Sequence, residues 1–409
     1  MAKTEELAIN GGPRAKKHPY GTGPKHVTRE LNALKKILER GKIEFARGPE
    51  VMELRERFRK LYGTKHCVTT SSGTAAIHTA LAALGVGRGD EVVTTSWSDA
   101  GTYIAILQQN AVPVMADVDP HSGNMLAESV AKKITRRTKA ILVVHLEGNP
   151  CDMGKMMKIA RKHKLPVVED MAQSYLCTYK GKKCGTFGTI GCFSLNDSKH
   201  IGAGDGGMLI TNDAKLADRA DLFADKCYDR TGQGRQPFLI GYNYRMNLLA
   251  AGVALEQLRS LKRLCAKRHR LGDKLSKLIR GLPGVTPHHV LPGAYCTYWH
   301  YTFHVDADRI TVSVPDFAKA LRAEGVSAGP MSRVVPEWPV FRDMIRSPHS
   351  CAWTCPLYKG KVDYSTDKLP GLRALAAGGF RMGLNEHWTD RDVNEVAKGI
   401  KKVALHYAK

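Results

Sequence analysis

Residues 140–170, AILVVHLEGNPCDMGKMMKIARKHKLPVVED, place one segment of helical period between two short apolar runs. The runs 140–145 and 166–170 are rich in β-branched residues and lack strict polar alternation, which is typical of strands buried on both faces. Two strands joined by the helix expected at 153–164 form a βαβ unit. Such units build parallel sheets that are covered by helices, so this stretch predicts an α/β fold.

The same rhythm extends over residues 50–260. Further buried strands are predicted at Glu91–Thr95, Pro113–Asp117, Gly191–Leu195 and Gly207–Thr211, and helices at Val51–Tyr62, Ala75–Leu84 and 126–134. The glycines of GVGRGD (85–90) end the second of these helices. The large part of the chain is therefore expected to be one mostly parallel, helix-covered sheet.

The pattern changes after about residue 250. One or two long helices are predicted over Leu248–Arg280, then a strand at Tyr298–Val305, a helix near 316–324, an irregular Pro/Trp-rich stretch at 330–360 and a last helix near 389–407 that Thr389 caps. We therefore divide the chain into an N-terminal segment (1–25), a large α/β domain (26–258) and a small α+β domain (259–409).

Composition limits the class of protein. The chain has 409 residues, of which 43% are hydrophobic and 25% charged, ordinary values for a soluble globular protein. No apolar stretch approaches the roughly 20 residues of a membrane span, and the first residues lack the apolar core of a secretory signal. Ten cysteines occur without a CxxC pair, which disfavours a zinc ribbon or a disulfide scaffold. We expect reduced thiols, a cytoplasmic protein, and no metal site or membrane partner.

The net charge is strongly positive, since 62 Lys and Arg stand against 39 Asp and Glu, giving +23. A nucleic-acid binder is one interpretation of such a charge. The basic residues occur only as short clusters, and no helix-turn-helix, zinc-finger or aromatic RNA-binding motif accompanies them. A solvated basic surface is the simplest interpretation, followed by a surface that attracts an anionic substrate. Nucleic acid is not expected as a partner.

Two segments have residues suited to ligand binding at the ends of predicted helices or strands. SSGTAA (71–76) precedes an apolar helix, where small residues and free N–H groups favour an anion. VVEDMAQ (167–173) ends a buried strand in Asp170, at the edge of the sheet where α/β proteins bind ligands. A carboxylate there can pair with a cationic ring nitrogen. Taken singly, each segment is equally an ordinary helix N-cap.

Two more segments follow. In CFSLNDSKH (192–200), Lys199 lies between a strand and the glycine run GAGDGG (202–207). A lysine held in such a pocket is desolvated and nucleophilic, although an isolated lysine is usually a surface charge. GYNYRM (241–246) offers Asn243 and Arg245 to a ligand or to a turn. The glycine run is no dinucleotide fingerprint, because it leads into a strand and not a helix.

In this order the four segments resemble the sugar aminotransferases of the DegT/DnrJ/StrS family, which are fold-type-I enzymes dependent on pyridoxal 5'-phosphate (PLP). The resemblance is firm from Gly48 to about residue 260 and looser to the C-terminus, where YWHY (298–301) matches a small-domain strand. It implies a large domain with a mostly parallel seven-stranded sheet flanked by helices, and a smaller α+β domain at the C-terminus.

The resemblance also implies roles for single residues. Lys199 matches the Schiff-base lysine, and Asp170 matches the carboxylate that pairs with the pyridinium nitrogen. Contacts to the phosphate are implied for Gly73, Thr74 and Ser194, and a contact to the 3-oxygen region of the ring for Gln173. A phosphate contact made from the partner subunit is implied for Asn243. A homodimer with shared active sites is therefore implied.

The chain departs from the family at two places. In the family an aromatic residue usually stacks on the PLP ring. The matching position in this chain is Asp99, and Trp97 lies two residues earlier. We favour Trp97 as the residue that stacks on the ring. Where the family has a Leu-Pro-Leu-His segment, this chain has MGLN (382–385). Substrate contacts are suggested for Arg245, which would bind a donor carboxylate or a substrate phosphate, and for Tyr175, Trp299 and Asn385.

The implied function is transfer of an amino group from a donor, glutamate or glutamine, to a keto sugar or keto-cyclitol through a Lys199 Schiff base, with ping-pong kinetics. An aminotransferase of a different ketone or amine range, or a non-catalytic PLP-binding regulator, is the alternative. Dehydratases of the family carry histidine at the lysine position, so Lys199 argues against that activity. Whether the acceptor carries a nucleotide stays open.

Overall fold

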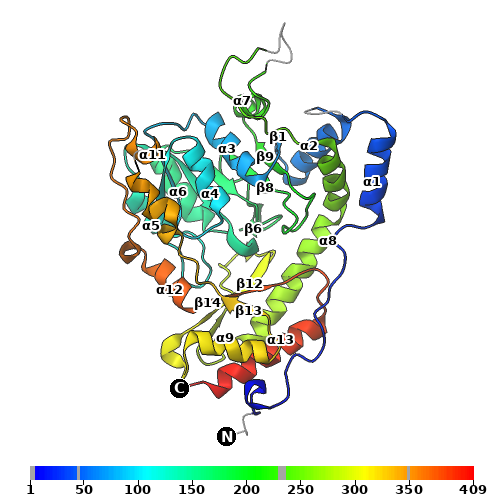
Figure 1. Ribbon diagram of the computed structural model, residues 1–409, viewed down its shortest axis with the longest axis vertical. Coiled ribbons are helices and arrows are strands. Elements are labelled where there is room, and N and C mark those ends of the chain that lie inside the picture. The colour runs from blue at the N-terminus through cyan, green and yellow to red at the C-terminus, as the bar shows by residue number, and fades with distance from the viewer. Residues whose placement is uncertain (1–4, 44–46, 229–235, 348–350) are drawn as a thin grey trace.

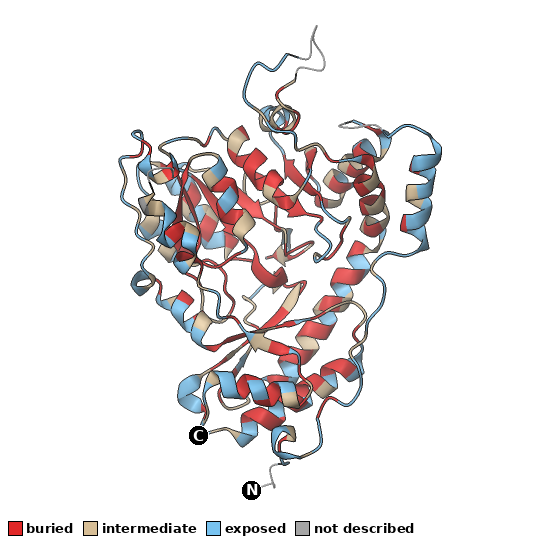
Figure 2. Cartoon of the chain, in the orientation of Figure 1, coloured by how far each residue is buried: buried red, intermediate tan, exposed pale blue. Residues whose placement is uncertain are grey.

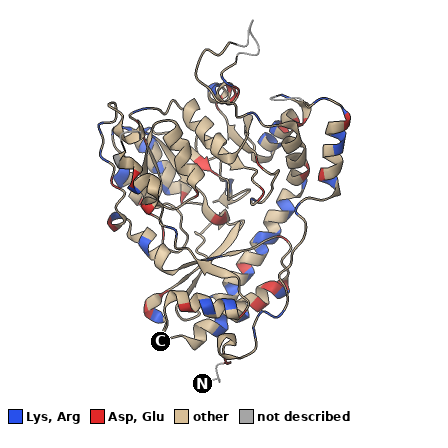
Figure 3. Cartoon of the chain, in the orientation of Figure 1, with Lys and Arg blue, Asp and Glu red and all other residues tan. Residues whose placement is uncertain are grey.

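The computed structural model describes residues 5–43, 47–228, 236–347 and 351–409. A wide α/β domain and a smaller domain are joined by one long helix (Figure 1). None of the helices in these ranges combines the length and the apolar character needed to cross a bilayer. Lys and Arg are spread over the outer helices of both domains (Figure 3).

The large domain is built on a seven-stranded sheet with the order β1-β9-β8-β5-β4-β2-β3. Only β9 runs antiparallel to its neighbours. The strands are β1 (His66–Thr70), β2 (Glu91–Thr95), β3 (Val112–Ala116), β4 (Thr138–Val144), β5 (Val167–Asp170), β8 (Ile190–Ser194) and β9 (Gly207–Thr211). The predicted α/β class and the mostly parallel seven-stranded sheet are confirmed. The pattern predicted six of these strands and missed β1, in which Cys67 and Val68 are flanked by a histidine and two threonines.

Helices cover both faces of this sheet, which explains why its strands are almost entirely buried (Figure 2). One face packs against α3 (Gly73–Ala83), α4 (Ala100–Gln108) and α7 (Ala214–Ala224). The other packs against α2 (Pro49–Tyr62), α5 (Ala127–Lys133), α6 (Met153–His163) and the first half of α8 (Leu248–Ile279). Alternate side chains of one strand enter the two cores, as Leu142 and Val143 of β4 do.

The small domain has its own four-stranded antiparallel sheet, ordered β10-β12-β14-β13. Its strands are β10 (Val285–Pro287), β12 (His300–Val305), β14 (Gly379–Gly383) and β13 (Ala328–Pro330), and its helices are α9 (Val314–Ala323) and α13 (Asp390–His406). The predicted cap is present, because the Thr389 side chain accepts a hydrogen bond from the backbone N–H of Asp392. A third, three-stranded sheet joins β6 (Thr178–Tyr179) to β7 (Lys182–Lys183) and β11 (Ala294–Tyr295).

The two cores meet inside α8, which is a single unbroken helix. Its side chains as far as Cys265 belong to the core of the large sheet, and those from Leu271 onward belong to the core of the small domain. The N-terminal segment packs on the small domain: Leu7 lies in that core, and Lys16 pairs with Asp392 at 2.9 Å. The predicted division at residue 258 thus falls within the helix that connects the domains, and it stays a prediction.

The Pro/Trp-rich stretch packs on the large domain, although it lies within 259–409. It contains α10 (Pro339–Arg342) and α11 (Cys351–Thr354). Helix α12 (Pro370–Gly378) follows the stretch in sequence. Helix α1 (Thr28–Glu39) is not part of it and packs against α8. Phe341 contacts the Tyr103 ring and shares an apolar cluster with Met115 of β3, and just beyond the stretch the Tyr364 hydroxyl donates to the Pro113 carbonyl of β3 at 2.7 Å. The stretch therefore covers the edge strand of the large sheet, which protects it from pairing with other chains.

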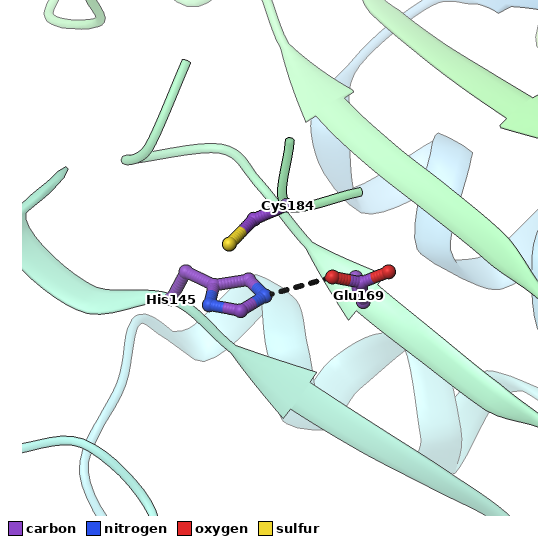
Figure 4. Close-up of side chains that lie close together, drawn as sticks. All are labelled: His145, Glu169 and Cys184. Atoms are coloured by element: carbon purple, nitrogen blue, oxygen red, sulfur yellow. Dashed lines mark hydrogen bonds and ion pairs between the residues drawn. The ribbon is translucent and has the colours of Figure 1, made fainter. Parts of the chain in front are cut away.

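A buried polar cluster fastens β4, β5 and the loop after β7 below the sheet edge (Figure 4). His145, Glu169 and Cys184 are the one group of three potential metal ligands within the described ranges. His145 Nε2 lies 3.1 Å from Glu169 Oε2, and the Glu169 carboxylate also accepts backbone N–H bonds from Gly185 and Gly188. His145 Nδ1 accepts from the Cys151 N–H. These bonds already satisfy the imidazole and the carboxylate, so the cluster has a structural role.

Replacing Glu169 with Gln is expected to lower the free energy of unfolding by about 2–4 kcal/mol, because an amide nitrogen would face buried N–H donors. Urea denaturation followed by circular dichroism measures the change. Glu128→Gln is the matched control, since Glu128 is exposed on α5. Equal stabilities of the two variants would contradict this role.

Candidate active site

A pocket of about 310 Å³ lies at the carboxyl ends of β5 and β8, between the N-termini of α3 and α4. Its lining includes Ser72, Gly73, Thr74, Asp99, Thr102, Asp170, Gln173, Ser194, Ser198, Lys199 and Trp299. Segments separated by more than 200 residues thus converge on one cavity. Seven of the residues that the sequence suggested for cofactor binding line it together.

Lys199 follows β8 and projects its amine into the pocket, with Nζ 4.0 Å from the centre of the Trp299 ring. Burial lowers the pKa of Lys199, and the negative charges of Asp170 and Asp99 partly oppose that shift. The backbone on this loop is anchored, because Lys25 Nζ donates to the Lys199 carbonyl at 2.6 Å. The result is a fixed lysine whose amine loses its proton more readily than an ordinary lysine does.

Asp170 ends β5 at the bottom of the pocket and is buried. One carboxylate oxygen accepts the Ala172 N–H at 3.0 Å and the other accepts the Thr102 hydroxyl at 3.3 Å. Burial raises the pKa of Asp170, against the effect of the Ala172 bond and of the Lys199 charge. A buried carboxylate of this kind is stabilised when a cation enters beside it.

The first turn of α3 forms a cradle against β8. Ser72 caps the helix by accepting the Ala75 N–H at 3.1 Å, and a Cβ atom on Gly73 would lie 2.6 Å from Ser194 Cβ. Only glycine permits this approach. The free N–H groups of α3 and the hydroxyl groups of Thr74 and Ser194 then surround one volume, which suits an anion such as a phosphate.

Gly73→Ala is expected to lower the free energy of unfolding by about 1–3 kcal/mol, because the added methyl group collides with β8. Thermal or urea denaturation tests this. Gly87→Ala is the control, since a Cβ at Gly87 meets no atom within 4 Å. If Gly73→Ala were as stable as Gly87→Ala, the cradle would not be closely packed.

Gln173 and Asp99 border the upper part of the pocket. The Gln173 Oε1 accepts the backbone N–H of Glu147 at 3.0 Å, which fixes the amide. Asp99 caps α4 and is exposed to the pocket, whereas Trp97 is 94% buried beside Leu146 and borders only a neighbouring cavity. The geometry therefore places Asp99, and not the preferred Trp97, in the cavity that contains Asp170.

That neighbouring cavity measures about 460 Å³ and shares Ser98, Asp99, Gln173, Lys199 and Trp299 with the first. Its other wall comes from the small domain, with residues 329–333 and Arg381. A ligand in this second cavity can reach the Lys199 amine. The two cavities together give the site a deep chamber in the large domain and an outer chamber between the domains.

The structure does not bring three suggested residues to these chambers. Tyr175 is fully buried and its hydroxyl donates to the Ser194 carbonyl at 2.8 Å, so it supports β8 and touches no substrate. Arg245 pairs with Asp225 at 2.6 Å and lines a different cavity near α8. Asn385 borders a third cavity with Trp299 and accepts the N–H groups of His387 and Trp388. Tyr175 and Arg245 therefore do not line the chambers of their own chain, and their contact with a substrate stays a prediction.

Asn243 is exposed, pairs through its backbone with Asp225, and does not line the chamber of its own chain. Sequence reasoning missed Thr102, Glu147 and Arg381. Thr102 lies in the first turn of the helix that follows Asp99, so its position could have been inferred. Glu147 and Arg381 carried no such signal, because the two are 234 positions apart and meet only across the domains.

Comparison with known proteins agrees with this geometry. A model of the DegT/DnrJ/EryC1/StrS aminotransferase family matches residues 24–401. The chain is 32% identical over 361 residues to GDP-perosamine synthase of Caulobacter vibrioides, covering 88% of this chain and 91% of that protein. It is 35% identical over 364 residues to L-glutamine:2-deoxy-scyllo-inosose aminotransferase of Streptomyces lividus, covering 85% and 84%. The aminotransferase TlmJ of Streptoalloteichus hindustanus has a similar structure, with a TM-score of 0.79, 27% identity and coverage of 93% and 97%.

Proposed function

Because the chain belongs to the DegT/DnrJ/EryC1/StrS aminotransferase family and is an aminotransferase, we propose that it uses PLP held at Lys199 to aminate a keto sugar or keto-cyclitol. The observation that carries this proposal is the convergence of Lys199, Asp170 and the α3 N-terminus on one chamber. A nucleophilic amine, a buried acid and an anion cradle are the three groups that an aldehyde-bearing, cationic ring with a phosphate requires.

The residues of the chamber fit PLP. The buried carboxylate of Asp170 would pair with the ring nitrogen, and the cradle of Gly73, Thr74 and Ser194 would take the phosphate. Gln173 would lie near the ring oxygen, and Asp99 would border one face of the ring. When bound, PLP supplies an aldehyde that condenses with amines and a ring that withdraws electrons from the substrate carbon.

The chain's own residues then handle protons and position. Lys199 would hold the cofactor through its amine, and the freed amine, with a pKa lowered by burial, would remove and return a proton at the substrate carbon. Asp170 would keep a proton on the ring nitrogen by charge pairing. Trp299, in contact with the Lys199 amine, limits the room in which that amine moves.

The two substrates use the site in turn. The donor leaves its amino group and departs as a keto acid before the acceptor enters, which predicts ping-pong kinetics. We propose glutamate or glutamine as donor. The names of the relatives, one a GDP-perosamine synthase and the other a 2-deoxy-scyllo-inosose aminotransferase, support a sugar or cyclitol ketone as acceptor.

We further propose that two copies share their sites. Phe238, Leu239 and Ile240 expose 57%, 66% and 88% of their surfaces, a patch that a partner subunit would cover. Asn243 lies three residues beyond this patch, is exposed and does not line its own chamber, as expected for a side chain that reaches the phosphate of the partner's site. The homodimer is thus consistent with the exposure of this segment.

Borohydride reduction followed by peptide mapping tests the function. Reduction of the PLP-loaded protein is expected to fix one cofactor per chain on the peptide that contains Lys199. A tag on another lysine, or no tag on cofactor-saturated protein, would refute the assignment. The unreduced protein treated in parallel is the control, since its tag is lost on denaturation.

A further inference from the structure

Arg381, in the small-domain wall of the outer chamber, belongs to an ion-pair network around a buried carboxylate of the large domain, which the functions assigned above do not use. Glu147, whose side chain is fully buried, lies 2.8 Å from His300 Nδ1 and 3.3 Å from Arg381 Nη1. Burial would raise the pKa of Glu147, but the hydrogen bond from His300 and the charge of Arg381 hold it below its ordinary value. The carboxylate is therefore charged and fixes one end of the Arg381 guanidinium.

The rest of that guanidinium faces the chamber. Arg381 keeps 37% of its side chain exposed and lines the outer chamber together with Lys199. In the described part of the chain its side chain has one hydrogen-bond partner, Glu147. A guanidinium carries five N–H donors in a rigid fork, so donors remain for a planar anion.

The neighbouring strand leaves room beside this fork. Gly329 of β13 is the direct antiparallel partner of Arg381 on β14, and side chains of such partners lie on the same face of a sheet. A Cβ at Gly329 would meet no atom within 4 Å. The absent side chain thus opens the space next to the guanidinium, and exposed Arg333 adds a second positive charge to the same wall.

We propose that Arg381, held in place by Glu147, binds a carboxylate of the amino donor; this assignment rests on the aminotransferase function proposed above. A carboxylate lies next to the reacting carbon of every amino-acid donor, whereas the ketone-bearing ring of a sugar or cyclitol is uncharged there. Lys199, which must exchange with the donor amine, lines the same chamber. Glu147 is a positioning residue in this arrangement, because it acts through Arg381.

Glutarate is a suitable probe, since it has carboxylates and no amine and therefore binds without reacting. Trp97 and Trp299 line the chamber, so its binding to the PLP-loaded protein can be followed by tryptophan fluorescence and checked by calorimetry. Arg381→Gln is expected to raise the Kd of glutarate and the KM of glutamate about 10- to 100-fold, the loss typical of a charged hydrogen bond, with little change in kcat. Arg381→Lys is expected to recover part of this loss.

Three further variants separate the site from general damage. Gly329→Leu fills the space beside the fork and is expected to weaken glutarate binding while leaving Arg381 intact. Glu147→Gln is expected to weaken binding less than Arg381→Gln does. Arg373→Gln is the matched control, because Arg373 is exposed on α12 and pairs with Asp367 away from the chamber; glutarate binding in this variant should equal that of the unaltered protein.

Unchanged glutarate binding in Arg381→Gln would overturn the proposal. So would a rise confined to the KM of a nucleotide-linked keto sugar, since that result would assign the guanidinium to the phosphates of an acceptor. Comparing Lys199→Ala with Lys199→Ala/Arg381→Gln keeps the two proposals apart. An Arg381-dependent Kd in that background establishes the carboxylate site even if another lysine holds PLP, and an Arg381-independent Kd there counts against it.

Discussion

Lys199→Ala is expected to abolish turnover, by roughly 10⁴-fold or more, and to remove the visible absorbance of lysine-bound PLP. Alanine can neither hold the cofactor covalently nor move a proton at the substrate carbon. The side chain is half-buried and its contact is with the Trp299 ring, so the fold should survive. Absorbance spectra of the PLP-saturated protein and single-turnover assays with glutamate measure the two effects.

Lys162→Ala is the control, because Lys162 is an exposed lysine at the end of α6. It should keep both the absorbance band and the rate. Near-normal turnover in Lys199→Ala would end the assignment of this residue, whatever the state of the spectrum. Circular dichroism of both variants shows whether any loss comes from misfolding.

Asp170→Asn is expected to lower kcat by about 10²- to 10³-fold, with a smaller change in KM. The amide has nearly the same shape but no charge, so it cannot keep a proton on the ring nitrogen and the withdrawal of electrons is weakened. Steady-state kinetics with saturating donor and acceptor separate kcat from KM. A change in KM alone would contradict the proposed role of the carboxylate.

The same variant makes a second, cofactor-free prediction. The negative charge of Asp170 raises the pKa of Lys199 against the effect of burial, so removing that charge should lower the lysine pKa further. Reductive methylation of Lys199 in the apoprotein, followed against pH by mass spectrometry, should show a midpoint displaced to lower pH. Asp152→Asn, a substitution in the N-cap of α6, is the control. An identical midpoint in both variants would contradict an electrostatic interaction between Asp170 and Lys199.

The large domain was predictable because its signals are local. A strand covered on both faces is buried along most of its length, and the runs that became β2, β3, β4, β5, β8 and β9 each contain adjacent apolar residues without strict polar alternation. Ligands of such sheets bind beyond the carboxyl ends of strands. Lys199, Asp170, Gly73 and Ser194 therefore could be placed on one edge of the sheet before the order of its strands was known.

Strand β1 (His66–Thr70) was missed, although, like β2, it has two adjacent apolar residues; its threonines are buried only in the assembled sheet. The stretch after residue 330 lacks the hydrophobic periodicity of a helix or a strand, so its conformation could not be predicted from its sequence. That conformation depends on packing against the edge of the large sheet.

The periods within single segments of the amino-acid sequence thus determined the class of fold, and the resemblance carried by its motifs indicated which residues line the deep chamber. Only the tertiary structure decided which side chains line the two chambers. It buried Tyr175 in the core, turned Arg245 towards Asp225, and set Arg381 against Glu147 across two domains. The physical reason is that a side chain's direction depends on strand register and domain packing, and these are fixed by contacts between residues hundreds of positions apart.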